Sequence, residues 1–432
     1  MNPTNDPALK SWIDVDTDCH FPIQNLPYGV FSRGQEPPRV GVAIGEHVLD
    51  LSALHGAGLL RHLDMDVFLA PFLNDFVALG RPVWRETRDR ISDLLSEGNP
   101  TVRDNQELRL TALLPMGEVR LHLPMRIGDY VDFYSSMYHA TNVGSMFRPD
   151  NPLMPNYKHL PVGYNGRASS VVVSGTPVGR PLGQTKPKDD EAPAYGPSRR
   201  LDFELEVGFF TGKENPMGRQ VSMDEAEEFI FGLVIVNDWS ARDIQRWEYQ
   251  PLGPFLSKSF ATSISPWVVT LDALEPFRVA GEPQDPPILP YLLTERDWHI
   301  DLNLEVALKT ERTARPQTIT RTNFRHMYWS MAQQLAHQTV NGTNIQVGDL
   351  YASGTVSSRF WDGKGTPPKP DELGSMLELA WAGTHPITLD ETEEERKFLE
   401  DGDTVVMTGW CEGDGYRVGF GEVSGQIVPP QY

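Results

Sequence analysis

Glycine and proline recur too often along this chain for long helices to dominate its fold. The sequence holds 37 Gly and 36 Pro in 432 residues, and its apolar stretches are short runs between turn residues. Both residue types weaken helix and strand interiors and are frequent in turns, so their spacing favours many short strands. We therefore predict a mainly β fold of the α+β class. At about 150 residues per domain, the length corresponds to two or three domains.

The N-terminal quarter has the pattern of a separate domain. Residues 39–51 form two short apolar runs around a Gly-Glu turn, which predicts a hairpin within a small barrel. Residues 67–79 and 82–96 have the apolar spacing of helices. The composition changes near residue 118, and we predict a small N-terminal domain over residues 1–118 and a larger domain over residues 119–432.

The rest of the chain alternates strand-like runs with Gly, Pro and Asn turns and is expected to be mostly β. Residues 222–225 have a capping-box pattern that predicts the start of a helix. Residues 186–200 and 357–372 are rich in charged residues and proline, and we expect both to be exposed excursions.

The charge balance excludes several classes of partner. Thirty-eight Lys and Arg stand against 59 Asp and Glu, a formal net charge of −21. Such a field repels nucleic acids and anionic membranes, although a small anion can bind where basic side chains reverse the sign locally. The chain starts without a leader pattern, and its longest apolar run is too short to cross a bilayer. We expect a cytoplasmic protein that binds neither nucleic acid nor membrane.

Residues 201–210 place acidic side chains at every second position. In an extended strand, Asp202, Glu204 and Glu206 would share one face, opposite a face of apolar residues. The solvated face of a half-buried strand is the favoured interpretation of this pattern alone. A metal site would need a second source of carboxylates.

Two further segments could supply polar groups. An apolar run ends at Asp238, where side chains commonly project into a cleft, although Asn237, Asp238 or Ser240 could instead cap a following helix, Ser240 most credibly. In that helix, one face would carry Arg242, Gln245 and Tyr249.

Residues 129–139 are unusually dense in Asp, Tyr and His. Asp132 and Tyr134 would share a strand face, while His139 taken alone is more often structural than catalytic. Lys258 taken alone is a surface lysine by default.

Several longer motifs follow one another in the C-terminal part of the chain. Residues 127–136 are IGDYVDFYSS, residues 237–245 are NDWSARDIQ and residues 374–378 are GSMLE. The others are HATNVG (139–144), LPVGY (160–164), GRASS (166–170), PLGPFLSKSF (251–260), ASGT (352–355) and GDGYRVGFG (413–421). In this order the motifs resemble the fumarylacetoacetase family, also called the fumarylacetoacetate hydrolase family. The first 118 residues resemble its N-terminal domain more loosely.

The resemblance implies a small SH3-like barrel followed by a β-roll domain of the fumarylacetoacetase type. It also implies a hydrolase acting on carbon–carbon bonds in ketonic substances (EC 3.7.1.2), which cleaves 4-fumarylacetoacetate into fumarate and acetoacetate in phenylalanine and tyrosine catabolism. The partner would be a small diketo dicarboxylate, and the chain would form a homodimer. The alternatives are a related acylpyruvate or diketo-acid hydrolase on the same fold, and a non-catalytic binding protein.

A divalent metal is part of what the resemblance implies. The implied ligands are four carboxylates, those of Asp132, Glu204, Glu206 and Asp238, with Lys258 and Thr262 adjoining them. Ligands that are all hard oxygens favour Mg²⁺ or Ca²⁺ without choosing between the two.

The resemblance also assigns roles in catalysis and substrate binding. His139 would be the general base, oriented by Glu378, and would deprotonate water. The implied oxyanion-stabilising group is Arg242, Gln245 and Lys258. The implied substrate contacts are Tyr134, Arg148, Tyr164, Arg242, Gln245, Tyr249, Gly354 and Thr355.

Overall fold

The N-terminal part of the chain is built on an antiparallel sheet. The computed structural model describes residues 2–186, 192–362 and 372–431. Five strands pair in the order β4-β3-β2-β1-β5. They are β1 (Tyr28–Ser32), β2 (Arg39–Ile44), β3 (His47–Asp50), β4 (Leu113–Pro115) and β5 (Arg120–His122). The predicted hairpin over residues 39–51 is confirmed, because β2 and β3 pair directly around Gly45 and Glu46.

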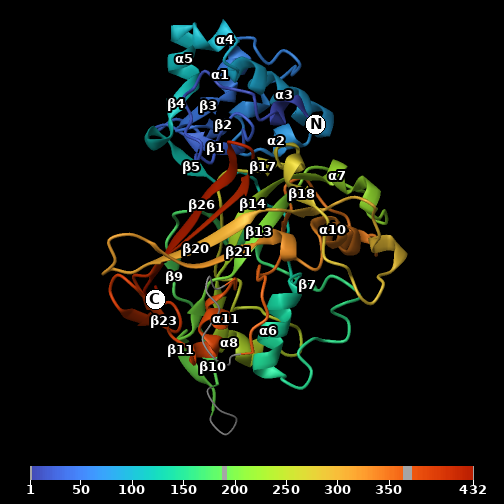
Figure 1. Cartoon of the computed structure of the whole chain (residues 1–432), viewed down its shortest axis with the longest axis vertical. Coiled ribbons are helices and arrows are strands. Elements are labelled where there is room, and N and C mark those ends of the chain that lie inside the picture. Colours follow the sequence, from blue (N-terminus) through green and yellow to red (C-terminus); the bar gives the residue numbers. More distant parts are fainter. Residues whose placement is uncertain (1, 187–191, 363–371, 432) are drawn as a thin grey trace.

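Short helices cover this sheet at the upper end of the molecule (Figure 1). They are α1 (Leu51–Gly56), α2 (Asn74–Val77), α3 (Arg81–Leu95), α4 (Pro100–Arg103) and α5 (Gln106–Ala112). Helix α3 confirms the predicted helix over residues 82–96. The helix predicted over residues 67–79 is wrong in extent, since only a 3-10 turn and α2 form there. Pro71 explains the break, because the preceding Ala70 is held in an extended conformation.

The centre of the molecule is an eight-stranded mixed sheet. Its order is β7-β6-β22-β13-β14-β16-β8, with β17 also paired to β14. The strands are β6 (Tyr130–Phe133), β7 (Gly163–Asn165), β8 (Val171–Val173), β13 (Leu205–Thr211), β14 (Ile230–Asp238), β16 (Thr262–Ile264), β17 (Val269–Thr270) and β22 (Leu350–Ala352). Strand β22 runs parallel to β6 and antiparallel to β13, so it joins segments that are distant in the sequence.

A second five-stranded sheet, β21-β20-β25-β26-β9, crosses the central sheet (Figure 1). Its strands are β9 (Val178–Gly179), β20 (Asn303–Lys309), β21 (Gln317–Asn323), β25 (Thr404–Glu412) and β26 (Arg417–Val428). Four two-stranded ladders complete the pairing: β10 (Leu182–Thr185) with β11 (Ala194–Pro197), β12 (Leu201–Asp202) with β15 (Ser240–Ala241), β18 (Arg278–Val279) with β19 (His299–Ile300), and β23 (Ile387–Leu389) with β24 (Glu394–Arg396). The fold is mixed α+β and mostly β, while the SH3-like barrel and β-roll stay predictions.

The helices of the C-terminal part are mostly short. They are α6 (Met137–Phe147), α7 (Ala226–Phe229), α8 (Arg242–Glu248), α9 (Leu271–Leu274), α10 (Met331–Thr339) and α11 (Met376–Leu379). The predicted capping box is confirmed at Ser222 and Glu225, where it opens a 3-10 turn that leads into α7.

Strand β14 is buried on both faces, which explains its unbroken apolar sequence. Leu233 and Ile235 belong to the core shared with the second five-stranded sheet. Val234 and Val236 belong to the core shared with the N-terminal part. Alternate residues of one strand therefore fill two different cores, and the polar residues Asn237 and Asp238 come at the end of the strand.

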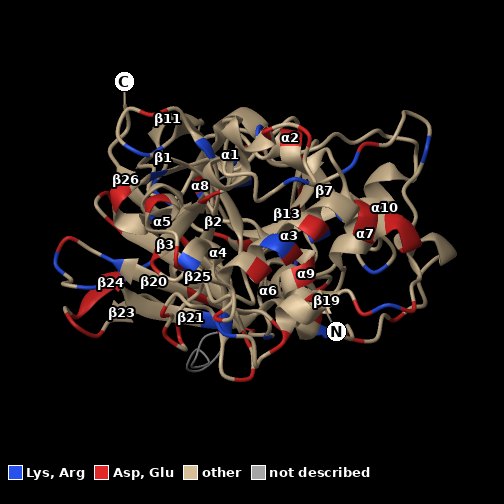
Figure 2. Cartoon of the chain, turned by 90° about the horizontal axis from the view of Figure 1, so that it is seen from above, with Lys and Arg blue, Asp and Glu red and all other residues tan. Residues whose placement is uncertain are grey.

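The remaining predictions about organisation have mixed outcomes. Within the described ranges no helix is long and apolar enough to cross a membrane. Acidic and basic residues are both spread over the chain (Figure 2). Parts of the two expected excursions, residues 187–191 and 363–371, lie outside the described residues. The domain boundary near residue 118 stays a prediction.

Candidate metal centre and active site

The acidic segment around β13 is fully buried. Every residue from 201 to 211 is buried, so the interpretation of residues 201–210 as a strand with a solvated face is wrong. The cause is tertiary, because the strand lies inside the molecule with other elements on both faces. Regular pairing also stops between β12 and β13, where Glu204 makes only an isolated bridge to Ser375.

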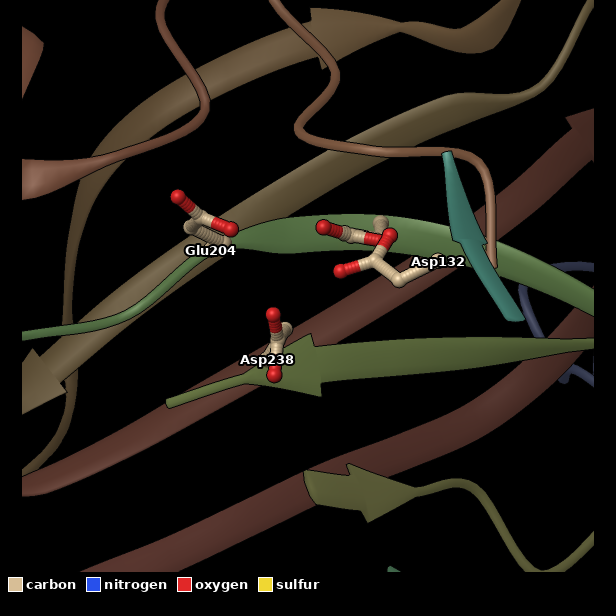
Figure 3. A group of neighbouring side chains, drawn as sticks. Asp132, Glu204 and Asp238 are labelled. Atoms are coloured by element: carbon tan, nitrogen blue, oxygen red, sulfur yellow. The ribbon is translucent and has the colours of Figure 1, made fainter. Parts of the chain in front are cut away.

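Four carboxylates meet at one edge of the central sheet. Asp132 lies near the end of β6, Glu206 near the start of the antiparallel β13, and Asp238 at the end of β14. Glu204 lies just before β13. One oxygen from each of the four side chains lies within 4.8 Å of the others. Figure 3 shows Asp132, Glu204 and Asp238 directed into a common space.

Lys258 is buried within this cluster and is not a surface lysine. Its Nζ forms ion pairs with Glu204 and, at 2.6 Å, with Oδ2 of Asp238. The charges of these two carboxylates outweigh the effect of burial and raise the pKa of Lys258. This ammonium therefore offsets part of the negative charge of the cluster.

Two hydroxyl groups complete the polar surroundings. The hydroxyl of Tyr164 lies 2.8 Å from Oδ2 of Asp132 and 3.0 Å from Oδ2 of Asp238. Thr262, which pairs with Asp238 across β14 and β16, donates to Oδ1 of Asp238 at 3.2 Å. Sheet pairing itself therefore brings both hydroxyls to the carboxylates.

The carboxylates differ strongly in proton affinity. Burial, followed by the charge of Asp238, raises the pKa of Asp132 well above its usual range. Burial and the charge of Asp132 do the same to Glu206. Burial also acts to raise the pKa of Glu204, but the charges of Lys258 and Arg242 lower it to about 2.

This donor set fits a divalent cation. Oδ1 of Asp132 and Oε1 of Glu206 are buried and accept no hydrogen bond from the described residues. A buried acceptor without a partner is costly, and a cation that prefers oxygen would satisfy both atoms. It would also offset the repulsion between carboxylates that, after burial, raises the pKa of Asp132 and Glu206.

His139 and Glu378 form a buried pair beside the cluster. His139 lies in the first turn of α6, and its Nδ1 is 2.7 Å from Oε2 of Glu378 in α11. The side chains are 3 % and 0 % exposed. The Glu378 carboxylate also accepts hydrogen bonds from Asn142, Ser357 and Ser375. Burial acts to raise the pKa of Glu378, but His139 and these hydrogen bonds lower it overall.

Arg242 begins α8 and ties three acidic or polar groups together. Its Nη2 lies 2.7 Å from Oε1 of Glu204, and its Nε donates to Oδ2 of Asp202 at 2.7 Å. Its Nη1 donates to Oε1 of Gln245 at 3.2 Å. Helix α8 is not capped by a side chain, since its N-cap is Ala241, and the capping role considered for residues 237–240 is wrong.

The other predicted substrate contacts fall into two groups. Tyr134 faces the imidazole of His139 edge-on at 5.2 Å between ring centroids. Gly354 donates its N–H to Oε2 of Glu206 at 2.9 Å, and Thr355 is buried next to it. Arg148 and Tyr249 are exposed, and their hydrogen bonds go to Pro152 and Gln250 instead of the carboxylates.

Several residues of the site have no role assigned to them by the sequence analysis. Asp202 was part of the acidic alternation but had no assigned role. Asn142 and Ser357 contact Glu378 from segments that no local pattern connects to it. Ser375 stands three residues before Glu378, which is the spacing of an N-cap serine and could have been recognised.

Gly354 allows a test of how the close packing beside the carboxylate cluster affects metal affinity. Its φ is +80°, and a Cβ at this position would overlap the carbonyl oxygen of Phe133, which follows Asp132. Gly354→Ala is expected to push β22 away from β6 and to weaken metal affinity by about 10- to 100-fold, the effect typical of a lost supporting contact. Calorimetric titration with Mg²⁺ or Ca²⁺ measures this.

Gly415 provides the matched control. Its φ is +78°, but nothing lies within 4 Å of the Cβ that a substitution would add. Gly415→Ala should cost about 1–2 kcal/mol of stability from the left-handed backbone alone and leave metal affinity unchanged. Equal metal affinities for the two variants would contradict the expectation for Gly354.

Two family models match nearly the whole chain. The fumarylacetoacetase N-terminal model matches residues 24–124, and the fumarylacetoacetate (FAA) hydrolase C-terminal model matches residues 130–428.

Known relatives match this chain over nearly their full length. Fumarylacetoacetase of Bos taurus is 54 % identical over 423 residues, 97 % of this chain and 99 % of that protein. Fumarylacetoacetase of Arabidopsis thaliana is 52 % identical over 426 residues, 98 % of this chain and 99 % of that protein. A solved fumarylacetoacetate hydrolase from Exiguobacterium antarcticum covers 94 % of this chain and 99 % of its own, with a TM-score of 0.51 and 16 % identity, a likeness of fold alone. The chain belongs to the fumarylacetoacetase family.

Proposed function

We propose that this chain is a hydrolase of carbon–carbon bonds in ketonic substances (EC 3.7.1.2). Its reaction is the hydrolysis of 4-fumarylacetoacetate to fumarate and acetoacetate, the last step of phenylalanine and tyrosine catabolism. The observation that carries this proposal is the buried His139–Glu378 pair beside four clustered carboxylates. The chain that holds them is 54 % identical to the fumarylacetoacetase of Bos taurus and 52 % identical to that of Arabidopsis thaliana.

The carboxylates of Asp132, Glu204, Glu206 and Asp238 would hold a divalent metal, with Mg²⁺ and Ca²⁺ as the two candidates. When bound, the metal supplies a Lewis acid that polarises the two oxygens of a 1,3-diketone and stabilises enolate charge. Lys258 would keep Glu204 and Asp238 in place, and Thr262 would orient Asp238.

His139 is proposed to start the reaction by taking a proton from water. Its Nδ1 faces Glu378, which would orient the imidazole so that Nε2 accepts that proton and would stabilise the imidazolium that forms. The water oxygen adds to the carbonyl carbon of the fumaryl group, and the bond from that carbon to the methylene carbon of the acetoacetate part breaks. The proton is then available to that carbon, which becomes the methyl group of acetoacetate.

The basic side chains are proposed to stabilise developing negative charge on oxygen. Arg242 and Lys258 are buried cations, and Oε1 of Gln245 accepts a hydrogen bond from Arg242, which would leave the amide N–H groups of Gln245 to act as donors. Tyr134, Tyr164, Tyr249, Gly354 and Thr355 are the proposed substrate contacts. Arg148 would pair with a substrate carboxylate and supply local positive charge in an acidic protein.

A single assay tests the proposal. Purified protein is mixed with 4-fumarylacetoacetate and Mg²⁺ or Ca²⁺, the loss of substrate absorbance is followed, and both products are identified. An acylpyruvate is tested in parallel. Turnover of the acylpyruvate alone would instead assign a related diketo-acid hydrolase, and no turnover of either substrate would refute the proposed function.

Two expectations about the whole molecule complete the proposal. We propose a homodimer formed through the C-terminal part, which light scattering on the purified chain would test. A cytoplasmic location is also proposed, and fractionation of cells that produce the protein would test it.

A further inference from the structure

Asp202 is a fully buried carboxylate that has no place in the mechanism described above. It is 0 % exposed and lies in β12. This strand pairs with β15, where Asp202 stands opposite Ser240, two residues before Arg242. Burying a charge in this way is expensive unless the charge is paired and hydrogen-bonded.

Both oxygens of the Asp202 carboxylate accept hydrogen bonds, from Arg242 of α8 and from two residues of α11. Oδ2 accepts a hydrogen bond from Nε of Arg242 at 2.7 Å and from the N–H of Leu377 at 3.0 Å. Oδ1 accepts a hydrogen bond from the N–H of Met376 at 2.8 Å. Asp202 therefore connects the start of α8 to the start of α11.

Helix α11 depends on such a contact because it is only one turn long. The residues Met376–Leu379 form too short a helix to be stable alone, and its first N–H groups have no partner within the helix. Ser375 caps the N–H of Glu378, while Asp202 takes the two N–H groups before it. The turn that carries Glu378 is thus anchored from a strand far away in the sequence.

We propose that Asp202 is a positioning residue that fixes Arg242 and Glu378 relative to one another. Through Glu378 it fixes the orientation of His139. Through Arg242 it holds the guanidinium beside Glu204. This inference rests on the proposed function, since it assigns Asp202 to the same reaction. Without Asp202, Arg242 in α8 and the first turn of α11 lose a side chain that both of them contact.

Asp403 offers a matched control for a purely structural role. It is also buried, pairs with Arg396 through two hydrogen bonds of 2.9 and 3.1 Å, and accepts the N–H of Glu400 at 2.9 Å. Its side-chain hydrogen bonds go to Arg396 and Glu400, and among the described residues none goes to His139, Glu378 or Arg242. Asp403→Asn therefore removes the same chemistry without touching the site.

Asp202→Asn is expected to lower kcat on 4-fumarylacetoacetate by about 10- to 100-fold per folded molecule, as for other lost supporting contacts. Asp403→Asn should keep the kcat of the unmodified chain, even if its unfolding midpoint falls by as much as that of Asp202→Asn. In a Glu378→Gln background, Asp202→Asn should lower kcat by less than it does alone, because both changes act through one group. Equal kcat losses for Asp202→Asn and Asp403→Asn, or full additivity with Glu378→Gln, would overturn the proposal.

Hydrogen exchange tests the same contact without any substrate. In the unmodified chain the amides of Met376 and Leu377 should exchange slowly, although both stand in the first turn of a helix. In Asp202→Asn their protection should fall, and in Asp403→Asn it should not. Fast exchange of these two amides in the unmodified chain overturns the proposal even if Asp202→Asn does not fold. Failure of the proposed function would show separately, as no turnover by the unmodified chain.

Discussion

His139→Ala is expected to lower kcat by about two to four orders of magnitude, the range for a lost general base. The chain should stay folded, because Ser136 still caps α6 and Glu378 keeps its hydrogen bonds from Asn142 and Ser357. Metal binding should also survive, since no imidazole belongs to the carboxylate cluster. Steady-state kinetics, circular dichroism and a metal titration on one preparation check all three expectations.

The partner of His139 should give a graded result. Glu378→Gln keeps the shape and an acceptor oxygen but removes the charge that stabilises the imidazolium, so an intermediate loss of rate is expected. His55→Ala is a suitable control, because His55 also faces a carboxylate, Asp66 at 3.9 Å, but lies on α1 in the N-terminal part. Near-normal rates in folded, metal-loaded His139→Ala would refute the base and direct the search to the carboxylates.

Local patterns predicted the elements whose contacts are local. The hairpin of β2 and β3, the helix α3 and the capping box at Ser222 all depend on residues a few positions apart. The helix expected over residues 67–79 failed at Pro71, a local signal that was outweighed by the apolar spacing around it. The solvated face expected near β13 failed for another reason. Burial on both sides of that strand is decided by elements that are distant in the sequence, which period-two alternation cannot reveal.

Residue patterns alone predicted single members of the site but not that they come together. Glu204 and Glu206 were visible as an acidic alternation, and Asp238 as the end of an apolar strand, yet each had an equally ordinary structural explanation. The pairing of β13 with β14 joins these three residues, and the pairing of β6 with β22 and of β22 with β13 adds Asp132. No sequence spacing encodes these long-range contacts. Only the resemblance of whole motifs supplied that connection beforehand. Asp202 had no such support, and its contacts with α11 became apparent only in three dimensions.

Removal of divalent metal is expected to abolish turnover completely. Burial and mutual repulsion raise the pKa of Asp132 and Glu206, and one buried oxygen of each accepts no hydrogen bond from the described residues. Without a cation the substrate would therefore meet neither a Lewis acid nor a fixed set of ligands. Dialysis against a chelator, with metal content measured afterwards, should give an inactive chain that Mg²⁺ or Ca²⁺ reactivates. The cation that restores the higher rate at the lower concentration identifies the better cofactor.

Asp238→Ala separates a loss of metal from a loss of fold. Asp238 is the ligand at the end of β14, and its removal leaves Lys258 with Glu204 alone, so metal affinity should fall together with rate. A ligand that binds only the folded state raises stability, by about 2.7 kcal/mol at a concentration of 100 Kd, so added Mg²⁺ or Ca²⁺ should raise the unfolding midpoint of the unmodified chain. The midpoint of Asp238→Ala should not respond, whereas Asp50→Asn, which alters a buried aspartate paired with Arg39 in the N-terminal sheet, should respond like the unmodified chain. Full activity in a chain verified to contain no metal would remove the cation from the mechanism and leave the four carboxylates without an explanation.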